Sequence, residues 1–187
     1  MYVEQNILSG PIPSSIGQLS NLASLHLSSN RLNGSIPLKI GKLQNLVDMY
    51  VDQNILSGPI PSSIGQLTNL THLWLSSNRL NGFLPPKTGK LKNLVTMDLG
   101  VNSLQGLIPA KIGDLTQLDY LDLRHNLLPG KIPSSIGQLM NLFHLDMFTN
   151  LINGTIPLEL GQLSRLAYLN LSWNQLLGQQ EIAPRKK

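Results

Sequence analysis

Three aspartates in the second half of the chain stand at a constant spacing. Asp98, Asp122 and Asp146 follow one another at equal steps, and Arg124 comes two positions after the second of them. Like charges on neighbouring strands would repel by roughly 1 to 4 kcal/mol unless a cation answers them. The spacing therefore predicts a pocket for a lysine or arginine of a ligand, with Arg124 as partial compensation. Three carboxylates spread apart in water are the alternative interpretation.

Aromatic residues and histidines share this spacing. Tyr50 and Trp74 are separated by the same step as the aspartates, and exposed aromatic side chains are typical anchors of protein interfaces. The histidines lack the spacing of metal ligands, so we expect them to be solvated. The candidate ligand-binding residues are Asp48, Tyr50, Asp52, His72, Trp74, Asp98, Tyr120, Asp122, Arg124, His144, Asp146, Phe148, Tyr168 and Trp173.

Motifs for catalysis are missing from the sequence. The chain has no cysteine, which excludes disulfides, thiolate catalysis and cysteine-zinc sites. It also lacks a nucleophile elbow, a phosphate-binding glycine loop and a His-Glu-x-x-His sequence. We therefore expect a protein that is not an enzyme and that needs neither a cofactor nor a metal.

Charge and hydropathy exclude two further classes. The net charge is +4, and the basic residues are scattered and not interleaved with aromatics, which argues against nucleic acid as a partner. No run reaches the roughly 18 apolar residues of a membrane span, and the residues after Met1 lack the basic and apolar regions of a signal peptide.

The elements that position these residues follow from a repeat that runs through the whole chain. Asparagine recurs every 24 residues from Asn6 to Asn174, which gives seven full turns of 24 residues. A glycine follows four positions after each of these asparagines. At a tight bend an asparagine amide can satisfy backbone groups of neighbouring turns that would otherwise be buried unpaired. The predicted structural asparagines are Asn30, Asn54, Asn78, Asn102, Asn126, Asn150 and Asn174.

One turn reads Leu19-x-x-Leu22-x-x-Leu25-x-Leu27-x-x-Asn30-x-Leu32-x-Gly34-x-Ile36-Pro37. Leu25 and Leu27 alternate with polar residues as in a short strand. The Leu-x-Gly-x-Ile-Pro pattern resembles the plant-specific class of leucine-rich repeat, known in receptor kinase ectodomains, receptor-like proteins and polygalacturonase inhibitors. The resemblance implies an α/β solenoid, a right-handed superhelix with a parallel concave β-sheet and short 3-10 or irregular convex segments.

The repeat covers residues 1–178, and residues 179–187 form a non-repeat basic tail that we expect to be flexible. Neither end carries a recognisable cap, whereas relatives in this family usually have caps with cysteines, so self-association through the ends is a further expectation. Thr88 stands where the preceding turn has Ile64, which predicts a locally weakened coil at residues 84–90.

The outward positions of the strands align in four columns. These columns hold six acidic residues and one basic residue, Arg124, which gives a charge of −5. They predict an acidic, aromatic-dotted concave face suited to a basic peptide or protein. Residues 1–34 and 49–82 differ at five positions, three of them in or beside the strand, as expected of a binding face or of drift at exposed positions.

The resemblance implies a recognition module, similar to part of a receptor kinase ectodomain, that binds a protein or peptide on its concave side. It also implies a cell-surface or extracellular location and a co-receptor as a second partner. One alternative is a secreted inhibitor of a microbial cell-wall glycosidase, similar to polygalacturonase inhibitors. A second is ice binding, which would need a regular array of Thr or Asn. Sequons at Asn33, Asn69, Asn153 and Asn170 would accept glycans in a secreted chain.

Overall fold

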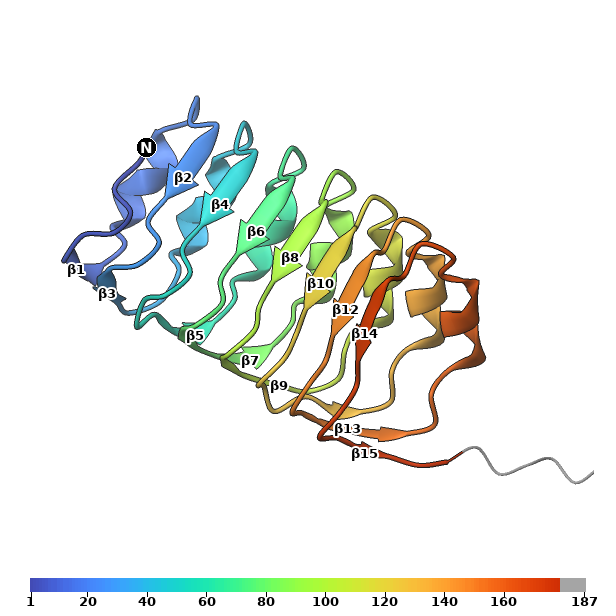
Figure 1. Cartoon of the computed structure of the whole chain (residues 1–187). Helices are drawn as coiled ribbons and strands as arrows, with labels where there is room; N and C mark the ends of the chain where they lie inside the picture. The colour runs from blue at the N-terminus through green and yellow to red at the C-terminus, as the bar shows by residue number, and fades with distance from the viewer. Residues whose placement is uncertain (179–187) are drawn as a thin grey trace, which may run out of the picture.

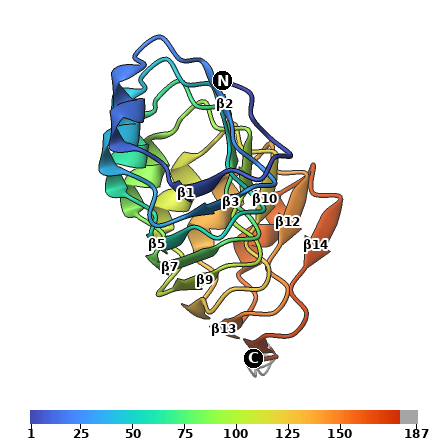
Figure 2. The same cartoon turned by 90° about the vertical axis from the view of Figure 1, so that its left-hand side faces the viewer.

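The computed structural model describes residues 1–178, which wind into a solenoid of stacked coils (Figure 1). The predicted tail, residues 179–187, lies outside the described residues. One side of the solenoid is a parallel sheet and the opposite side is a row of short 3-10 helices, as the view along the stack shows (Figure 2). The predicted solenoid with a parallel sheet and short 3-10 segments is confirmed.

Each coil contributes one three-residue strand to a seven-stranded sheet with the order β14-β12-β10-β8-β6-β4-β2. Equivalent residues pair across neighbouring strands, so that Leu121 lies beside Met97 and Leu145. Residues one repeat apart in sequence therefore become neighbours in space. The strands are β2 (Ser24–His26), β4 (Asp48–Tyr50), β6 (His72–Trp74), β8 (Thr96–Asp98), β10 (Tyr120–Asp122), β12 (His144–Asp146) and β14 (Tyr168–Asn170).

The opposite side of each coil begins at a proline. Pro37 has a φ of −69° and an extended ψ, and its carbonyl accepts a hydrogen bond from the Ile40 N–H at 2.9 Å, which closes the first 3-10 turn. The same geometry repeats in every coil. The helices are η1 (Ser14–Gln18), η2 (Leu38–Lys42), η3 (Ser62–Gln66), η4 (Pro86–Lys90), η5 (Ala110–Asp114), η6 (Ser134–Gln138) and η7 (Leu158–Gln162).

Thr88 does not disturb this pattern. Helix η4 has five residues like its neighbours, and the buried Thr88 hydroxyl donates to the Pro85 carbonyl at 2.8 Å. The backbone of residues 84–90 therefore keeps the regular geometry, because the hydroxyl finds a partner in its own turn. A lower stability of this coil stays a prediction.

A third side of the solenoid carries short strands after each asparagine bend. They pair in parallel as β1-β3, β5-β7-β9 and β11-β13-β15. Their bounds are β1 (Ser9–Pro11), β3 (Arg31–Asn33), β5 (Ser57–Pro59), β7 (Arg79–Phe83), β9 (Ser103–Gln105), β11 (Pro129–Gly130), β13 (Leu151–Gly154) and β15 (Gln175–Leu176).

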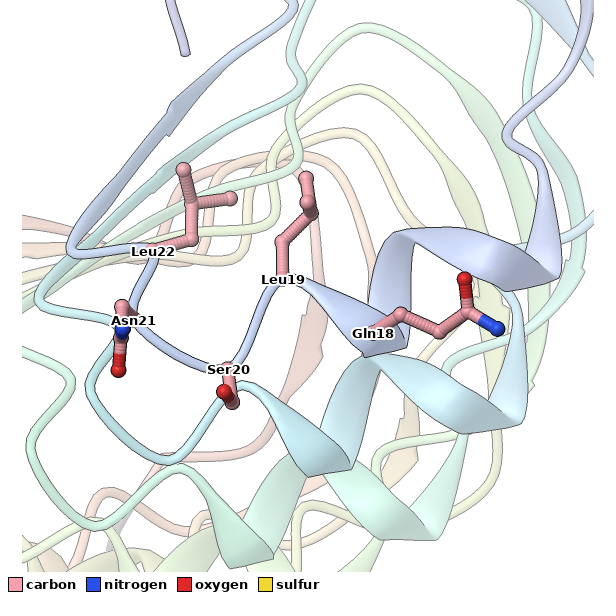
Figure 3. Close-up of a pocket in the computed structure, with 5 residues that line it drawn as sticks. All are labelled: Gln18, Leu19, Ser20, Asn21 and Leu22. Atoms are coloured by element: carbon pink, nitrogen blue, oxygen red, sulfur yellow. The ribbon is translucent and has the colours of Figure 1, made fainter.

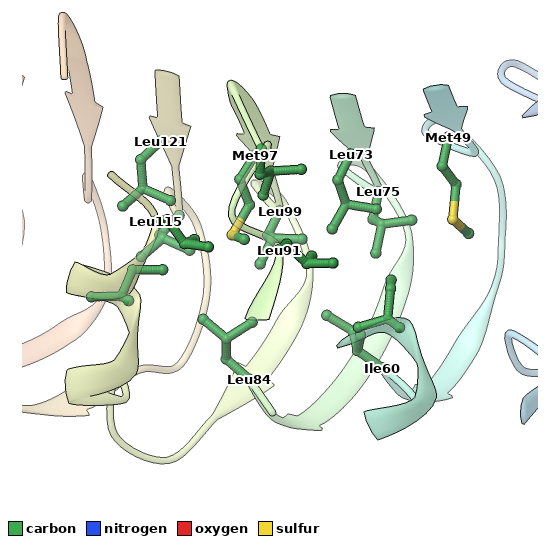
Figure 4. Close-up of a cluster of buried hydrophobic side chains, with 14 of the residues drawn as sticks. Met49, Ile60, Leu73, Leu75, Leu84, Leu91, Met97, Leu99, Leu115 and Leu121 are labelled. Carbon is green, nitrogen blue, oxygen red and sulfur yellow. The ribbon is translucent and has the colours of Figure 1, made fainter. Parts of the chain in front are cut away.

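Leucines from all three sides fill the interior as a continuous core (Figure 4). Leu73, Leu91 and Leu121 are at most 1% exposed. Because every coil supplies the same positions, each apolar layer packs on the layers before and after it, and burial of this surface is the main stabilising contribution.

Asparagine side chains join the coils at the bend after each strand. The Asn126 amide nitrogen donates to the Leu99 carbonyl of the preceding coil at 3.0 Å and to the Leu123 carbonyl at 3.1 Å. Its oxygen accepts the Leu104 N–H at 2.9 Å. One side chain thus satisfies backbone groups of two coils, and Asn54, Asn78, Asn102 and Asn150 make equivalent bonds.

Candidate ligand-binding face

We call the outer surface of the seven-stranded sheet the concave face, and an uninterrupted series of rings crosses it. Neighbouring rings in this series have centroids 4.2 to 6.4 Å apart, within the usual range of aromatic pairs. We call the series the aromatic row. It consists of Tyr2, His26, Tyr50, Trp74, Tyr120, His144 and Tyr168.

From His26 to Trp74 the rings stand at the last position of each strand, and from Tyr120 onward they stand at the first position. The strand between these two groups, β8, contributes no ring to the row. Trp74 on β6 and Tyr120 on β10 stack across that strand, 6.4 Å apart with planes at 9°. Beneath them the Thr96 hydroxyl contacts the Trp74 indole nitrogen at 3.1 Å and the His72 Nδ1 at 2.9 Å. Thr96 thus anchors two ring side chains of β6, Trp74 and His72.

His144 is the middle member of a stack of three rings. Its centroid lies 4.2 Å from that of Tyr120 and 4.3 Å from that of Tyr168, with planes at 13° and 2°. The His144 Nε2 atom is buried and has no hydrogen-bond partner among the described residues, and burial lowers the pKa of the imidazole. The ring is therefore neutral at pH 7 and contributes a flat aromatic surface, which contradicts the expectation of a solvated histidine.

The aspartates lie beneath this aromatic layer. Asp98 is 6% exposed, Asp122 is 0% exposed and Asp146 is 3% exposed. The expectation of an exposed row of carboxylates is therefore wrong, because neighbouring groups shield these side chains from solvent. Asp52, at 8% exposed, is also buried.

Backbone amides bind the covered carboxylates. Asp122 Oδ1 accepts the Arg124 N–H at 2.9 Å, and Asp146 Oδ1 accepts the Phe148 N–H at 2.9 Å. Asp98 accepts the Gly100 N–H and the Ser76 hydroxyl. Each side chain thus caps the bend that follows its own strand, and this local role was not visible from the spacing alone.

Burial sets the ionisation of these groups. Loss of solvent raises the pKa of Asp122 to about 6, with Asp98 adding to the increase, while the Arg124 N–H and guanidinium oppose it. Burial also raises the pKa of Asp98. The pKa of Tyr120 rises to about 12 through burial and through the charges of Asp122 and Asp98. The phenol therefore stays protonated, while Asp122 titrates in mildly acidic solution.

In the described part of the chain, hollows open on the concave face toward both of its ends. One, of about 250 Å³, lies toward the N-terminal end and is lined by Glu4, His26, Ser28, Tyr50, Asp52 and Trp74. The other, of about 380 Å³, lies toward the C-terminal end and is lined by Val101, Arg124, His125, Asp146, Phe148, Tyr168 and Asn170. We call them the N-terminal hollow and the C-terminal hollow.

The remaining candidates are distributed around these features. Asp48 accepts the Ser24 hydroxyl at 2.9 Å beside the N-terminal hollow, and Phe148 meets His125 edge to face at 5.0 Å. Trp173 is 78% exposed at a bend with a φ of 58° and lies outside the row. The sequence prediction had omitted Tyr2 and His26, although both share the column of Tyr50 and could have been found from it.

A further hollow, lined by Gln18, Leu19, Ser20, Asn21 and Leu22, lies at the edge of the first coil (Figure 3). Leu19 is 47% exposed there, whereas the equivalent Leu43 is fully buried by a coil on each side. This hollow therefore results from the end of the stack, and its lining residues lie outside the seven-stranded sheet.

The sequons differ in their surroundings. Asn33 and Asn153 are exposed on β3 and β13. The Asn69 amide nitrogen donates to the Gln44 carbonyl at 2.9 Å, and the Asn170 side chain accepts the Ser172 N–H at 3.1 Å. Glycosylation at all four stays a prediction.

Within residues 1–178, no cluster of three or more histidine or acidic side chains is arranged to hold a metal ion. The same part of the chain has no helix with the length and hydropathy needed to cross a bilayer.

Two leucine-rich repeat family models match the chain, one at residues 68–128 and the other at residues 21–43. The comparison with curated proteins gives no match. Many solved structures are similar, and the most informative are from plants.

The ectodomain of the receptor kinase GASSHO1/SCHENGEN3 from Arabidopsis thaliana, solved with CASPARIAN STRIP INTEGRITY FACTOR 2, is 41% identical with a TM-score of 0.94. The match covers 95% of this chain and 21% of that one. The Arabidopsis receptor kinase HAESA, solved with the peptide hormone IDA and the co-receptor SERK1, is 40% identical with a TM-score of 0.92, over 95% and 30% of the two chains. A plant ice-binding protein is 30% identical with a TM-score of 0.77, over 94% and 65%.

The chain belongs to the leucine-rich repeat family. Within that family it is of the plant type and resembles the ectodomains of receptor kinases. It spans about a fifth to a third of the length of the first receptor ectodomains that it matches.

Proposed function

We propose that this chain is an extracellular recognition module that binds an extended peptide across its concave face. The aromatic row is the observation that supports this proposal. It crosses the sheet from β2 to β14 with one contact that spans β8, its neighbouring rings contact one another, and Thr96 hydrogen-bonds to Trp74. A preformed aromatic surface binds with little loss of side-chain entropy.

The comparisons support the same proposal. Two of the similar receptor ectodomains were solved with a peptide hormone or an integrity factor, and one of them also with a co-receptor. A protein co-receptor is therefore included in the proposal as a second partner.

Selection from a random dodecapeptide library on the immobilised chain tests this function. We expect selected peptides to bind the unmodified chain and to bind Tyr120→Ser at least about tenfold more weakly, because the stack with Trp74 and His144 is removed. Phe83→Ser is the matched control, since Phe83 is 69% exposed on β7 and away from the concave face. A library that yields no peptide, or peptides indifferent to Tyr120→Ser, would reject the proposal.

Ice binding is the second candidate, because a plant ice-binding protein is among the similar structures. The strand positions here carry a mixture of rings, carboxylates and hydroxyls, whereas ice binding needs a regular array. We expect no thermal hysteresis in a freezing-point measurement. A clear hysteresis that Tyr120→Ser leaves unchanged would favour ice binding over peptide recognition.

A further inference from the structure

The N-terminal hollow combines aromatic walls with carboxylates. Tyr50 is its central ring, with the His26 centroid 4.5 Å away on one side and the Trp74 centroid 5.7 Å away on the other, both tilted at 57°. All three rings line the hollow. Aromatic π faces attract cations, and tryptophan attracts them most strongly.

Among the described residues, the carboxylates of this hollow have no cationic partner. Glu4 is exposed, and one oxygen of Asp52 accepts the Ser28 hydroxyl. The ion pairs found among residues 1–178 involve Asp114 and Asp122, not Glu4, Asp48 or Asp52. The amino group of Met1, at the same end of the chain, donates to the Ser24 carbonyl at 2.6 Å.

The C-terminal hollow has the opposite character. Arg124 lies 3.4 Å from Asp122, with its side chain 46% exposed, so a guanidinium already occupies this part of the face. Asp146, the acidic residue that lines this hollow, is only 3% exposed. A ligand cation would meet Arg124 here before it met a carboxylate.

We propose that the N-terminal hollow is a cation subsite, in which Tyr50, Trp74 and the exposed Glu4 receive the guanidinium or ammonium group of an arginine or lysine in the bound peptide, and the charge of the largely buried Asp52 adds to the attraction. The inference rests on the proposed function and adds the chemistry of one ligand residue and its position on the face. It moves the predicted cation pocket from the aspartates of β8, β10 and β12 to the coils that contain β2, β4 and β6.

Arginine fits this subsite better than lysine does. Its flat guanidinium can lie against a ring and donate to a carboxylate at the same time. Partial burial and the charges of Asp48 and Asp52 raise the pKa of Tyr50, so the phenol remains neutral beside the bound cation.

The test begins with the dodecapeptides selected from the random library. We expect arginine or lysine at one recurring position. For an enriched peptide, replacement of that arginine by citrulline, which has the same shape but no charge, should weaken binding to the unmodified chain about tenfold. On Asp52→Asn the same replacement should matter about twofold.

Asp114→Asn is the matched control, because it removes the same charge from the opposite side of the solenoid, where Asp114 contacts Lys92 and Lys111. The citrulline penalty should stay about tenfold on this variant. Glu4→Gln is a second variant for the case that Asp52→Asn disturbs folding, since Glu4 is exposed.

The outcomes separate the two proposals. Peptides without a recurring cation, or a citrulline penalty that is the same on Asp52→Asn, Glu4→Gln and Asp114→Asn, would overturn the cation subsite and leave peptide recognition standing. A library that yields no binding peptide would overturn both.

Discussion

Asp122 offers the most direct test of the arrangement beneath the aromatic row. Its carboxylate is 0% exposed, one oxygen accepts the Arg124 N–H at 2.9 Å, and the other lies 3.4 Å from the Arg124 Nε. Asn in place of Asp122 keeps the acceptor oxygen for the backbone N–H but cannot ionise. The variant Asp122→Asn therefore isolates the free energy of holding a charge at this position.

The direction in which pH changes the stability follows from the direction of the change in the pKa of Asp122. The pKa rises from 3.8 to about 6 on folding, so between these values the folded chain binds more protons than the unfolded chain does. The contribution of Asp122 to stability is complete below about pH 4 and is lost as the pH rises through 6. At about 1.4 kcal/mol per pKa unit the loss amounts to roughly 3 kcal/mol.

Urea unfolding of both proteins from pH 4 to pH 7.5 measures this loss. We expect the free energy of unfolding of Asp122→Asn, minus that of the unmodified chain, to increase by roughly 2.5 kcal/mol across this range, since a small part of the loss has already occurred at pH 4. The constant part of the difference, which includes the contact between the new amide and Arg124, cancels in the comparison. A difference that does not change with pH would show that Asp122 is not held in a site that opposes its charge.

Three further predictions concern the coil and are measured by the same urea unfolding at pH 7. Gly89→Ala should destabilise by about 1 to 3 kcal/mol because the new methyl would lie 2.5 Å from the Lys111 carbonyl oxygen of the next coil, whereas Gly161→Ala, with nothing within 4 Å, should be close to neutral. Asn126→Ala should cost about 3 kcal/mol or more, since it leaves buried backbone groups of two coils unpaired; a loss under about 1 kcal/mol would contradict this role. Val101→Asn should stabilise by about 1 kcal/mol, because a β-branched residue is strained at a φ of 54° and asparagine is tolerated there; a destabilised variant would refute the assignment of strain.

The sequence predicts the fold well because every coil has to solve the same packing problem. Leu25, Ile36 and Pro37 recur at fixed offsets, and an insertion or deletion would move a whole layer out of register with its neighbours. One constant step along the chain thus determines the strand, the bend and the 3-10 turn at once, and parallel pairing of equivalent residues follows from it.

The site was harder to predict because the spacing of the repeat shows which residues are neighbours on the sheet. It does not show which of these residues shield others from solvent. The strand alternation directs three aspartates outward, Asp98, Asp122 and Asp146, yet all three are buried. Asp122 and Asp146 accept backbone N–H groups of the bends after their strands. The height of a side chain above the sheet depends on its rotamer and on neighbours in two directions. Neither quantity is contained in the spacing of the repeat.

The same reasoning explains the stack at His144. Tyr120, His144 and Tyr168 share one column, so their proximity follows from the repeat. Their nearly coplanar stacking and the unpaired Nε2 of His144 depend instead on how three rotamers fit together. A position predicted to be a solvated histidine thus became part of an aromatic surface.

The two similar segments of the chain show how such a face can differ while the coil stays the same. Residues 1–34 and 49–82 keep the leucines, asparagines, glycines and prolines, and two of their five differences are Ser24 to His72 and His26 to Trp74. In the structure His26 and Trp74 lie on opposite sides of Tyr50, and Ser24 and His72 hydrogen-bond to different residues, Asp48 and Thr96. Because the interior positions are tied to coil closure and the outward ones are not, substitutions at the outward positions alter the chemistry of the hollow without altering the step of the solenoid. The subsite proposed at Tyr50 therefore depends on residues that the repeat leaves free to vary.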